Sequence, residues 1–227
     1  SAATDEPKVD LAQACGKGKL DACYSLALSH DKKGEKAEAR RLYKLACDGG
    51  ETWSCVNLGS IEETAKNLPE AKRLYGKACA GGQLTGCANL GVIEKQAGNL
   101  PEARKLLKKA CDGTNAWGCF VLGTLEKKAG NKVEASRVFK LACDGGNLDG
   151  CYSLGLMSDE VGNKIEARRL YALGCDGGET SSCVNLGVLE EEEGNKPEAK
   201  KRYEKACAGG QDIGCKNLQK LSEATKK

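Results

Sequence analysis

The sequence has little of what a metal site requires. Its 227 residues include one histidine, His30, and no two cysteines in a C-x-x-C spacing. Zinc sites in proteins use clustered ligands of that kind. We therefore expect neither a metal site nor a cofactor.

Long apolar runs and a charge excess are also missing. The longest apolar stretches span a few residues, far fewer than a membrane-spanning helix needs. Thirty-five basic and thirty-two acidic residues leave a net charge of +3, spread along the whole chain. This pattern argues against a transmembrane segment and against nucleic acid or an anionic membrane as partner. A targeting segment removed ahead of Ser1 would leave no trace in this sequence.

The common catalytic motifs are absent as well. There is no Walker loop, no G-x-S-x-G, no H-E-x-x-H, and no S-x-x-K with its partner motifs. The repeat described below aligns His30 with Glu62, Glu94, Glu126, Ser158 and Glu190, which we interpret as a solvated polar helix position. The sequence thus predicts a protein that is not an enzyme.

What the chain does have is fourteen cysteines in a strict pattern. Two cysteines of a pair are eight positions apart, and successive pairs follow at 32 positions: Cys15 and Cys23, Cys47 and Cys55, Cys79 and Cys87, Cys111 and Cys119, Cys143 and Cys151, Cys175 and Cys183, Cys207 and Cys215. A period of this length is typical of a solenoid of helical repeats. The even number and regular spacing favour disulfides, and hence an oxidising compartment, over free thiols.

The spacing permits two pairing schemes. Each cysteine bonds either the partner eight positions on or, across a helical hairpin, a more distant one, such as Cys23 with Cys47. The near scheme uses all fourteen cysteines, whereas the distant scheme leaves Cys15 and Cys215 unpaired and is the weaker choice. Each near bridge would add roughly 2 to 3 kcal/mol to stability in the chain-entropy model.

Within each period the apolar pattern predicts two helices. Helix A, from about Thr52 to Lys66 in one repeat, places Ser54, Leu58, Ile61 and Ala65 on one face. Gly-Asn then marks its end in four repeats, and helix B follows, with proline in its first turn in three. We predict an all-α, right-handed solenoid of about six 32-residue helix-turn-helix repeats with half-repeats at both ends. It forms one domain over residues 10–227 after an N-terminal arm at residues 1–9.

Two further positions recur in these helices. A glycine follows the buried leucine of helix A, as in Leu58-Gly59, and suggests that a second backbone comes close there. A glutamate recurs in the first turn of helix B, with arginine or lysine three residues later. We interpret this row as helix-end charge pairing rather than as an acid/base site. The glutamates are Glu38, Glu70, Glu102, Glu134, Glu166 and Glu198.

A longer period is superimposed on the short one. The segment Cys47-Asp48-Gly49-Gly50-Glu51-Thr52 recurs from Cys175, a shift of 128 positions. Ala80-Gly81-Gly82-Gln83 recurs from Ala208 with the same shift. This indicates duplication of a block of four repeats.

The order Leu58-Gly59, Ala71, Tyr75 and Ala78 resembles the tetratricopeptide repeat signature. The A-C-D-G-G, C-x-N-L-G and G-N-x-x-E-A phrases resemble the Sel-like repeat family, especially the Helicobacter cysteine-rich proteins, over most of the chain. The resemblance implies that family's fold and disulfide pattern and a secreted or periplasmic bacterial adaptor. It also implies an alternative function, since some members bind or slowly cleave β-lactams.

The variable face of helix A is the candidate binding surface. Helix A lines the concave side of tetratricopeptide-like stacks, and aromatic side chains on it would suit a partner. Its asparagines could clamp an extended peptide backbone, although the rings could instead pack between repeats. The predicted partner-binding residues are Tyr24, Trp53, Asn57, Asn89, Trp117, Phe120, Tyr152 and Asn185.

The sequence therefore predicts a monomeric protein- or peptide-binding scaffold. The alternatives are a binder or weak hydrolase of β-lactam or cell-wall-like small molecules, and a redox role in which a cysteine pair exchanges with client thiols.

Overall fold

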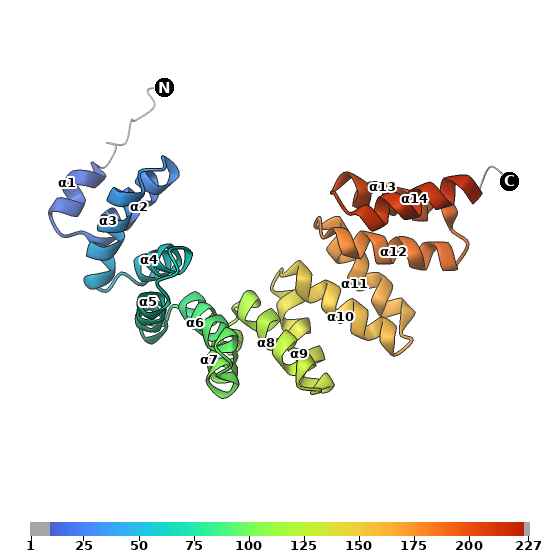
Figure 1. Cartoon of the computed structure of the whole chain (residues 1–227), viewed down its shortest axis with the longest axis horizontal. Helices are drawn as coiled ribbons and strands as arrows, with labels where there is room; N and C mark the ends of the chain where they lie inside the picture. The colour runs from blue at the N-terminus through green and yellow to red at the C-terminus, as the bar shows by residue number, and fades with distance from the viewer. Residues whose placement is uncertain (1–9, 225–227) are drawn as a thin grey trace, which may run out of the picture. The chain divides into compact units, whose positions relative to one another are not determined.

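The computed structural model describes residues 10–224, and the predicted arm at residues 1–9 lies outside this range. The described residues form fourteen helices and no strand (Figure 1). The helices are α1 (Leu11–Gly16), α2 (Leu20–Lys32), α3 (Lys36–Asp48), α4 (Thr52–Thr64), α5 (Leu68–Ala80), α6 (Leu84–Gln96), α7 (Leu100–Asp112), α8 (Ala116–Lys128), α9 (Lys132–Asp144), α10 (Leu148–Glu160), α11 (Lys164–Asp176), α12 (Thr180–Glu192), α13 (Lys196–Ala208) and α14 (Asp212–Ala224).

The helices alternate as predicted. The even-numbered helices α2 to α14 are the A helices, α3 to α13 are the B helices, and α1 is the end of a B helix. This confirms an all-α fold of six helix pairs with a half-repeat at each end. None of the helices within residues 10–224 combines the length and the apolar character needed to span a bilayer.

Local signals in the sequence account for the helix boundaries. Gly98 adopts φ 80° between α6 and α7, and Gly82 adopts φ 87° between α5 and α6. These left-handed conformations suit glycine, which lacks a Cβ. Pro69 lies in the first turn of α5, where a missing backbone donor is harmless. Lys66 and Thr114 adopt the same left-handed conformation in two other turns, so glycine marks most of the helix ends but not all of them.

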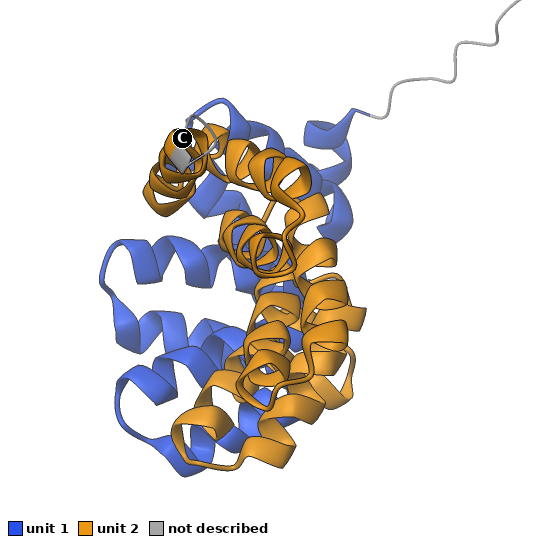
Figure 2. Cartoon of the chain, turned by 90° about the vertical axis from the view of Figure 1, so that its right-hand side faces the viewer, with its two compact units in different colours: residues 1–110 blue, residues 111–227 orange. Residues whose placement is uncertain are grey.

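The chain divides into two compact units, residues 1–110 and 111–227 (Figure 2). In the first unit α2 packs on α3, α3 on α4, α4 on α5 and α5 on α6. In the second unit the same order of contacts runs from α8 to α14. The expectation of a single domain over residues 10–227 stays a prediction.

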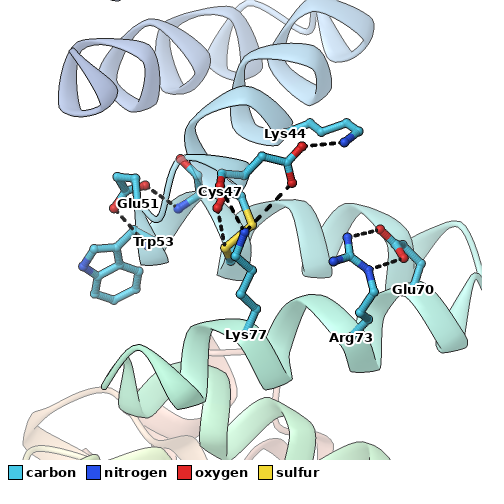
Figure 3. Close-up of a disulfide and its surroundings, with 10 residues drawn as sticks. Lys44, Cys47, Glu51, Trp53, Glu70, Arg73 and Lys77 are labelled. Carbon is cyan, nitrogen blue, oxygen red and sulfur yellow. Dashed lines mark hydrogen bonds and ion pairs between the residues drawn. A yellow bond between two sulfur atoms is a disulfide. The ribbon is translucent and has the colours of Figure 1, made fainter. Parts of the chain in front are cut away.

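Seven disulfides join the cysteines that are eight positions apart. Each bridge links the end of a B helix to the start of the next A helix, as Cys47 of α3 links to Cys55 of α4 (Figure 3). Both of these cysteines are fully buried. The bridges therefore connect consecutive repeats, and all their cysteines are buried except Cys143, Cys207 and Cys215, which are half-buried.

The core also explains the glycine that follows the leucine in α4, α6, α8, α10 and α12, and it corrects our expectation. A Cβ at Gly59 would lie 2.7 Å from the ring of Tyr75, and one at Gly123 would lie 2.5 Å from that of Phe139. The glycine therefore leaves room for a large B-helix side chain of the same repeat. The second backbone comes close elsewhere: a Cβ at Gly86 would lie 2.9 Å from the Tyr75 carbonyl oxygen.

The row of first-turn glutamates forms the predicted charge pairs. Glu70 accepts hydrogen bonds from the Arg73 guanidinium at 2.7 and 2.8 Å, and Glu134 is held by Arg137 in the same way. The Arg73 hydrogen bonds lower the pKa of Glu70 below its ordinary value. These carboxylates pair with a base on their own helix and stabilise the helix ends.

Candidate functional site

The two tryptophans are the most exposed of the predicted binding residues. Trp53 of α4 is 44% exposed and Trp117 of α8 is 43% exposed. Residues just before each helix fix its start: Glu51 accepts hydrogen bonds from the backbone N–H groups of Trp53 and Ser54, and Asn115 accepts one from that of Gly118. In Figure 3 the Trp53 ring points away from the Cys47–Cys55 bridge. Both rings are available for contact on a fixed helix start.

The other three predicted aromatic residues pack against buried rings of the core. The centroid of the Tyr24 ring lies 6.2 Å from that of Tyr43, and Tyr152 has the same separation from Tyr171. Phe120 lies 6.1 Å from Phe139 and 5.7 Å from Trp117. Tyr24, Phe120 and Tyr152 are thus half-buried against the B helix of their own repeat. They support the surface and present only part of each ring.

The predicted asparagines lie beside buried tyrosines. Asn57 is near the Tyr43 hydroxyl, Asn89 near that of Tyr75, and Asn185 near that of Tyr171. Burial raises the pKa of Tyr171 to about 12, and the nearby Asn185 amide acts in the opposite direction. All three asparagines are half-buried.

The first unit has a groove between two neighbouring A helices, α2 and α4. Its volume is about 610 Å³, within the range of ligand pockets. Trp53 lies one helical turn before Asn57 on α4 and so extends this face beyond the groove. The groove is lined by Leu28, Asp31, Lys36, Asn57, Ser60, Ile61, Thr64 and Ala65.

The structure also shows a buried polar ladder that our sequence interpretation missed. The position aligned with His30 is not solvated in the other repeats, because Glu62, Glu94, Glu126 and Glu190 are 2–7% exposed. In α6, the Glu94 carboxylate lies 2.5 Å from Lys72 Nζ of the preceding repeat and accepts a hydrogen bond from Asn99 at 3.1 Å. The hydrogen bond from Lys72 lowers the pKa of Glu94 below its ordinary value, and the hydrogen bond from Asn99 lowers it by a smaller amount. Glu62 and Glu190 pair in the same way with Arg40 and Arg168 of the preceding repeat, so these three carboxylates tie one repeat to the next.

A signal in the sequence could have revealed this ladder. The fifth repeat has Ser158 in place of the glutamate. The preceding B helix has Ser136 at the position where the other repeats have arginine or lysine, such as Lys72. Acid and base are therefore lost together, as expected of groups that pair across a repeat boundary. His30 itself contacts the Glu35 carboxylate through Nδ1, and its side chain is 25% exposed.

We find no arrangement within residues 10–224 of three or more histidine, cysteine, aspartate or glutamate side chains that could hold a metal ion. The described residues offer a set of A-helix surfaces with exposed indole rings and half-buried amides, and an open groove between α2 and α4. This is the geometry of a helical-repeat scaffold, a class that uses extended surfaces for binding.

Comparisons with known proteins agree with this class. Residues 84–115 match the tetratricopeptide repeat family model. No curated protein sequence matches the chain.

Several solved structures share the fold. A protective antigen of uropathogenic Escherichia coli with an SLR fold is 22% identical with a TM-score of 0.76, over 92% of this chain and 50% of the antigen. A Sel1 repeat protein from Oxalobacter formigenes is 19% identical with a TM-score of 0.73, over 86% of both chains. PilF of Pseudomonas aeruginosa is 18% identical with a TM-score of 0.65, over 81% of this chain and 88% of PilF. The chain has the fold of Sel1 and tetratricopeptide repeats, and it spans half the length of the Escherichia coli antigen.

Proposed function

We propose that this chain is a non-enzymatic scaffold that binds an extended segment of a partner protein or peptide through the face of its A helices. It acts as a monomer in an oxidising compartment, the periplasm or the exterior of a bacterial cell.

The groove between α2 and α4 is the observation that carries this proposal. It combines the apolar side chains of Leu28 and Ile61 with the amide of Asn57 and the ion pair of Asp31 with Lys36. Apolar side chains can receive a side chain of the partner, while an amide can hydrogen-bond its backbone. An open groove with such a lining suits an extended peptide better than a small enclosed substrate.

The disulfides support both the compartment and the mode of binding. Seven bridges persist only where thiols are not kept reduced. A cross-linked repeat array also holds its surface in one conformation before the partner arrives. Less conformational entropy is then lost on binding.

A capture experiment with the oxidised chain tests the proposal. The wild-type chain is compared with Trp53→Ala, next to the groove, and with Leu141→Ala, which removes a 40% exposed side chain from a B helix instead of an A helix. Partners from a bacterial envelope fraction are quantified by mass spectrometry, and binding is then measured with the purified partner. We expect Trp53→Ala to weaken binding at least tenfold and Leu141→Ala to leave it unchanged. Equal effects of the two variants would reject the A-helix face.

A further inference from the structure

Four of the residues that line the groove of the first unit have counterparts in the second unit. Leu28, Asp31, Lys36 and Asn57 recur 128 positions later as Leu156, Asp159, Lys164 and Asn185. The first set lies on α2, α3 and α4, and the second on α10, α11 and α12. We call the set with Asn57 the first groove and the set with Asn185 the second groove.

The ion pair of the first groove is repeated in the second. Lys36 Nζ lies 2.6 Å from the Asp31 carboxylate, and Lys164 Nζ lies 2.8 Å from that of Asp159. In both units the lysine is the first residue of a B helix, and the aspartate lies near the end of the preceding A helix. The charged side of each groove is thus built in the same way.

The tyrosines beneath the two grooves also match. Tyr43 and Tyr171 are fully buried, and each packs on a half-buried tyrosine of its own A helix. The hydroxyls of both have no hydrogen-bond partner among the described residues. Asn57 and Asn185 lie close to these hydroxyls without a hydrogen bond of good geometry. Each groove therefore has a buried polar atom whose hydrogen-bonding capacity is unused.

In the next repeat of each unit, the equivalent tyrosine hydroxyl does have a hydrogen-bond partner. Tyr75 donates a hydrogen bond to Glu63 at 2.8 Å, and Tyr203 donates one to Glu191 at 2.9 Å. Asp31 and Asp159 take the place of these glutamates in the two grooves, with a side chain one methylene shorter. Because each aspartate instead pairs with a lysine, the tyrosine hydroxyl behind it stays free.

From these observations we propose that the chain has two equivalent peptide subsites, one in each unit, and binds two copies of the same short segment. The inference rests on the proposed function and deepens it. In each subsite an apolar side chain of the segment lies against the leucine, and a backbone peptide group hydrogen-bonds to the asparagine. The asparagine amide, turned by that contact, then satisfies the tyrosine hydroxyl behind it.

One difference between the grooves specifies the ligand further. Thr64 and Ala65 of the first groove correspond to Glu192 and Glu193 in the second. Glu192 lies 3.3 Å from Lys164, so the second groove carries additional negative charge at its edge. A segment with lysine or arginine next to its apolar residue would bind the second groove more tightly, and added salt would reduce that preference.

The test uses a peptide selected for these grooves. A phage library of random dodecapeptides is panned against the oxidised full chain after depletion on the Asn57→Ala/Asn185→Ala double variant. The most enriched peptide is synthesised and titrated by calorimetry into the wild-type chain and both single variants. Ser153→Ala, at the equivalent half-buried position of α10, is the matched control. Circular dichroism verifies each fold, and Asn57→Asp with Asn185→Asp replaces any alanine variant that fails to fold.

We expect two peptides per wild-type chain, one per single variant and none for the double variant, with Ser153→Ala unchanged. Each single variant should weaken one binding event at least tenfold. One peptide per chain, lost in only one single variant, would refute the twin subsites and leave the proposed function standing. Failure to select any peptide, or binding that ignores both asparagines, would overturn the proposed A-helix groove together with this inference.

Discussion

Breaking the ion pair between Lys72 and Glu94 should cost more than breaking an ordinary surface pair. Glu94 is 7% exposed, and its carboxylate depends on Lys72 Nζ at 2.5 Å and Asn99 at 3.1 Å. Two unit charges 4 Å apart attract by about 4 kcal/mol at an effective dielectric constant of about 20. Lys72 stays 41% exposed, so water screens part of this attraction. We expect a coupling free energy of about 1.5 kcal/mol.

A double-mutant cycle measures this coupling. Lys72→Met, Glu94→Gln and the double variant are unfolded in guanidinium chloride with their disulfides intact, followed by circular dichroism. The control cycle uses the adjacent pair of Arg73 with Glu70, which lies on one helix with side chains 53% and 35% exposed. Pairs of that kind contribute about 0.3 to 0.5 kcal/mol. Equal coupling energies in the two cycles would refute the idea that the buried carboxylate joins the repeats.

The pH dependence of the same cycle gives a second check. The folded-state pKa of Glu94 lies below its ordinary value, chiefly because of Lys72. A group whose pKa is lower in the folded state stabilises the protein above its unfolded pKa, and this contribution is lost as the pH falls through the folded pKa. The coupling should therefore be full at neutral pH and shrink as the pH falls below the ordinary pKa of a glutamate. A coupling that does not change with pH would contradict the assignment.

Three further predictions concern the core. Replacing Cys47 and Cys55 with alanine should lower the free energy of unfolding by about 2 to 3 kcal/mol. Mass spectrometry should find the wild-type Cys47–Cys55 bridge resistant to dithiothreitol until a denaturant is added, because both cysteines are buried. Tyr203→Phe should cost about 1 kcal/mol by losing the hydrogen bond to Glu191, whereas Tyr171→Phe should be neutral or stabilising in the same denaturation assay. Tyr171→Phe should also remove an absorbance step near pH 12. Gly150→Ala should lower the midpoint of thermal unfolding, because its Cβ would lie 2.7 Å from that of Ala142, and an unchanged midpoint would contradict this packing.

Much of the fold was predictable because each repeat carries its own local signals. Cysteines at a fixed spacing, glycine at the turns and proline in a first helical turn act within a few residues of where they stand. Such signals can be read from the sequence without knowing how the neighbouring repeat packs. The sixfold repetition also showed which positions are equivalent, and thus where the A-helix surface varies.

The candidate site was less predictable, because burial depends on residues of another helix. The predicted aromatic residues all lie on A helices, yet the structure leaves Trp53 and Trp117 exposed and packs Tyr24 and Tyr152 on B-helix rings. Periodicity within one helix cannot separate these cases. Whether the surface binds a partner stays a prediction.

By itself the sequence determined the period, the alternation of helices and the positions of their ends, since these follow from backbone preferences and short-range spacing. Only the tertiary structure decided which glycine faces a ring and which faces a backbone, and that the glutamates equivalent to His30 are buried. It also decided that the hydroxyls of Tyr43 and Tyr171 have no hydrogen-bond partner within residues 10–224. Each of these depends on a distance between two helices, and a helical period records only which residues share a face.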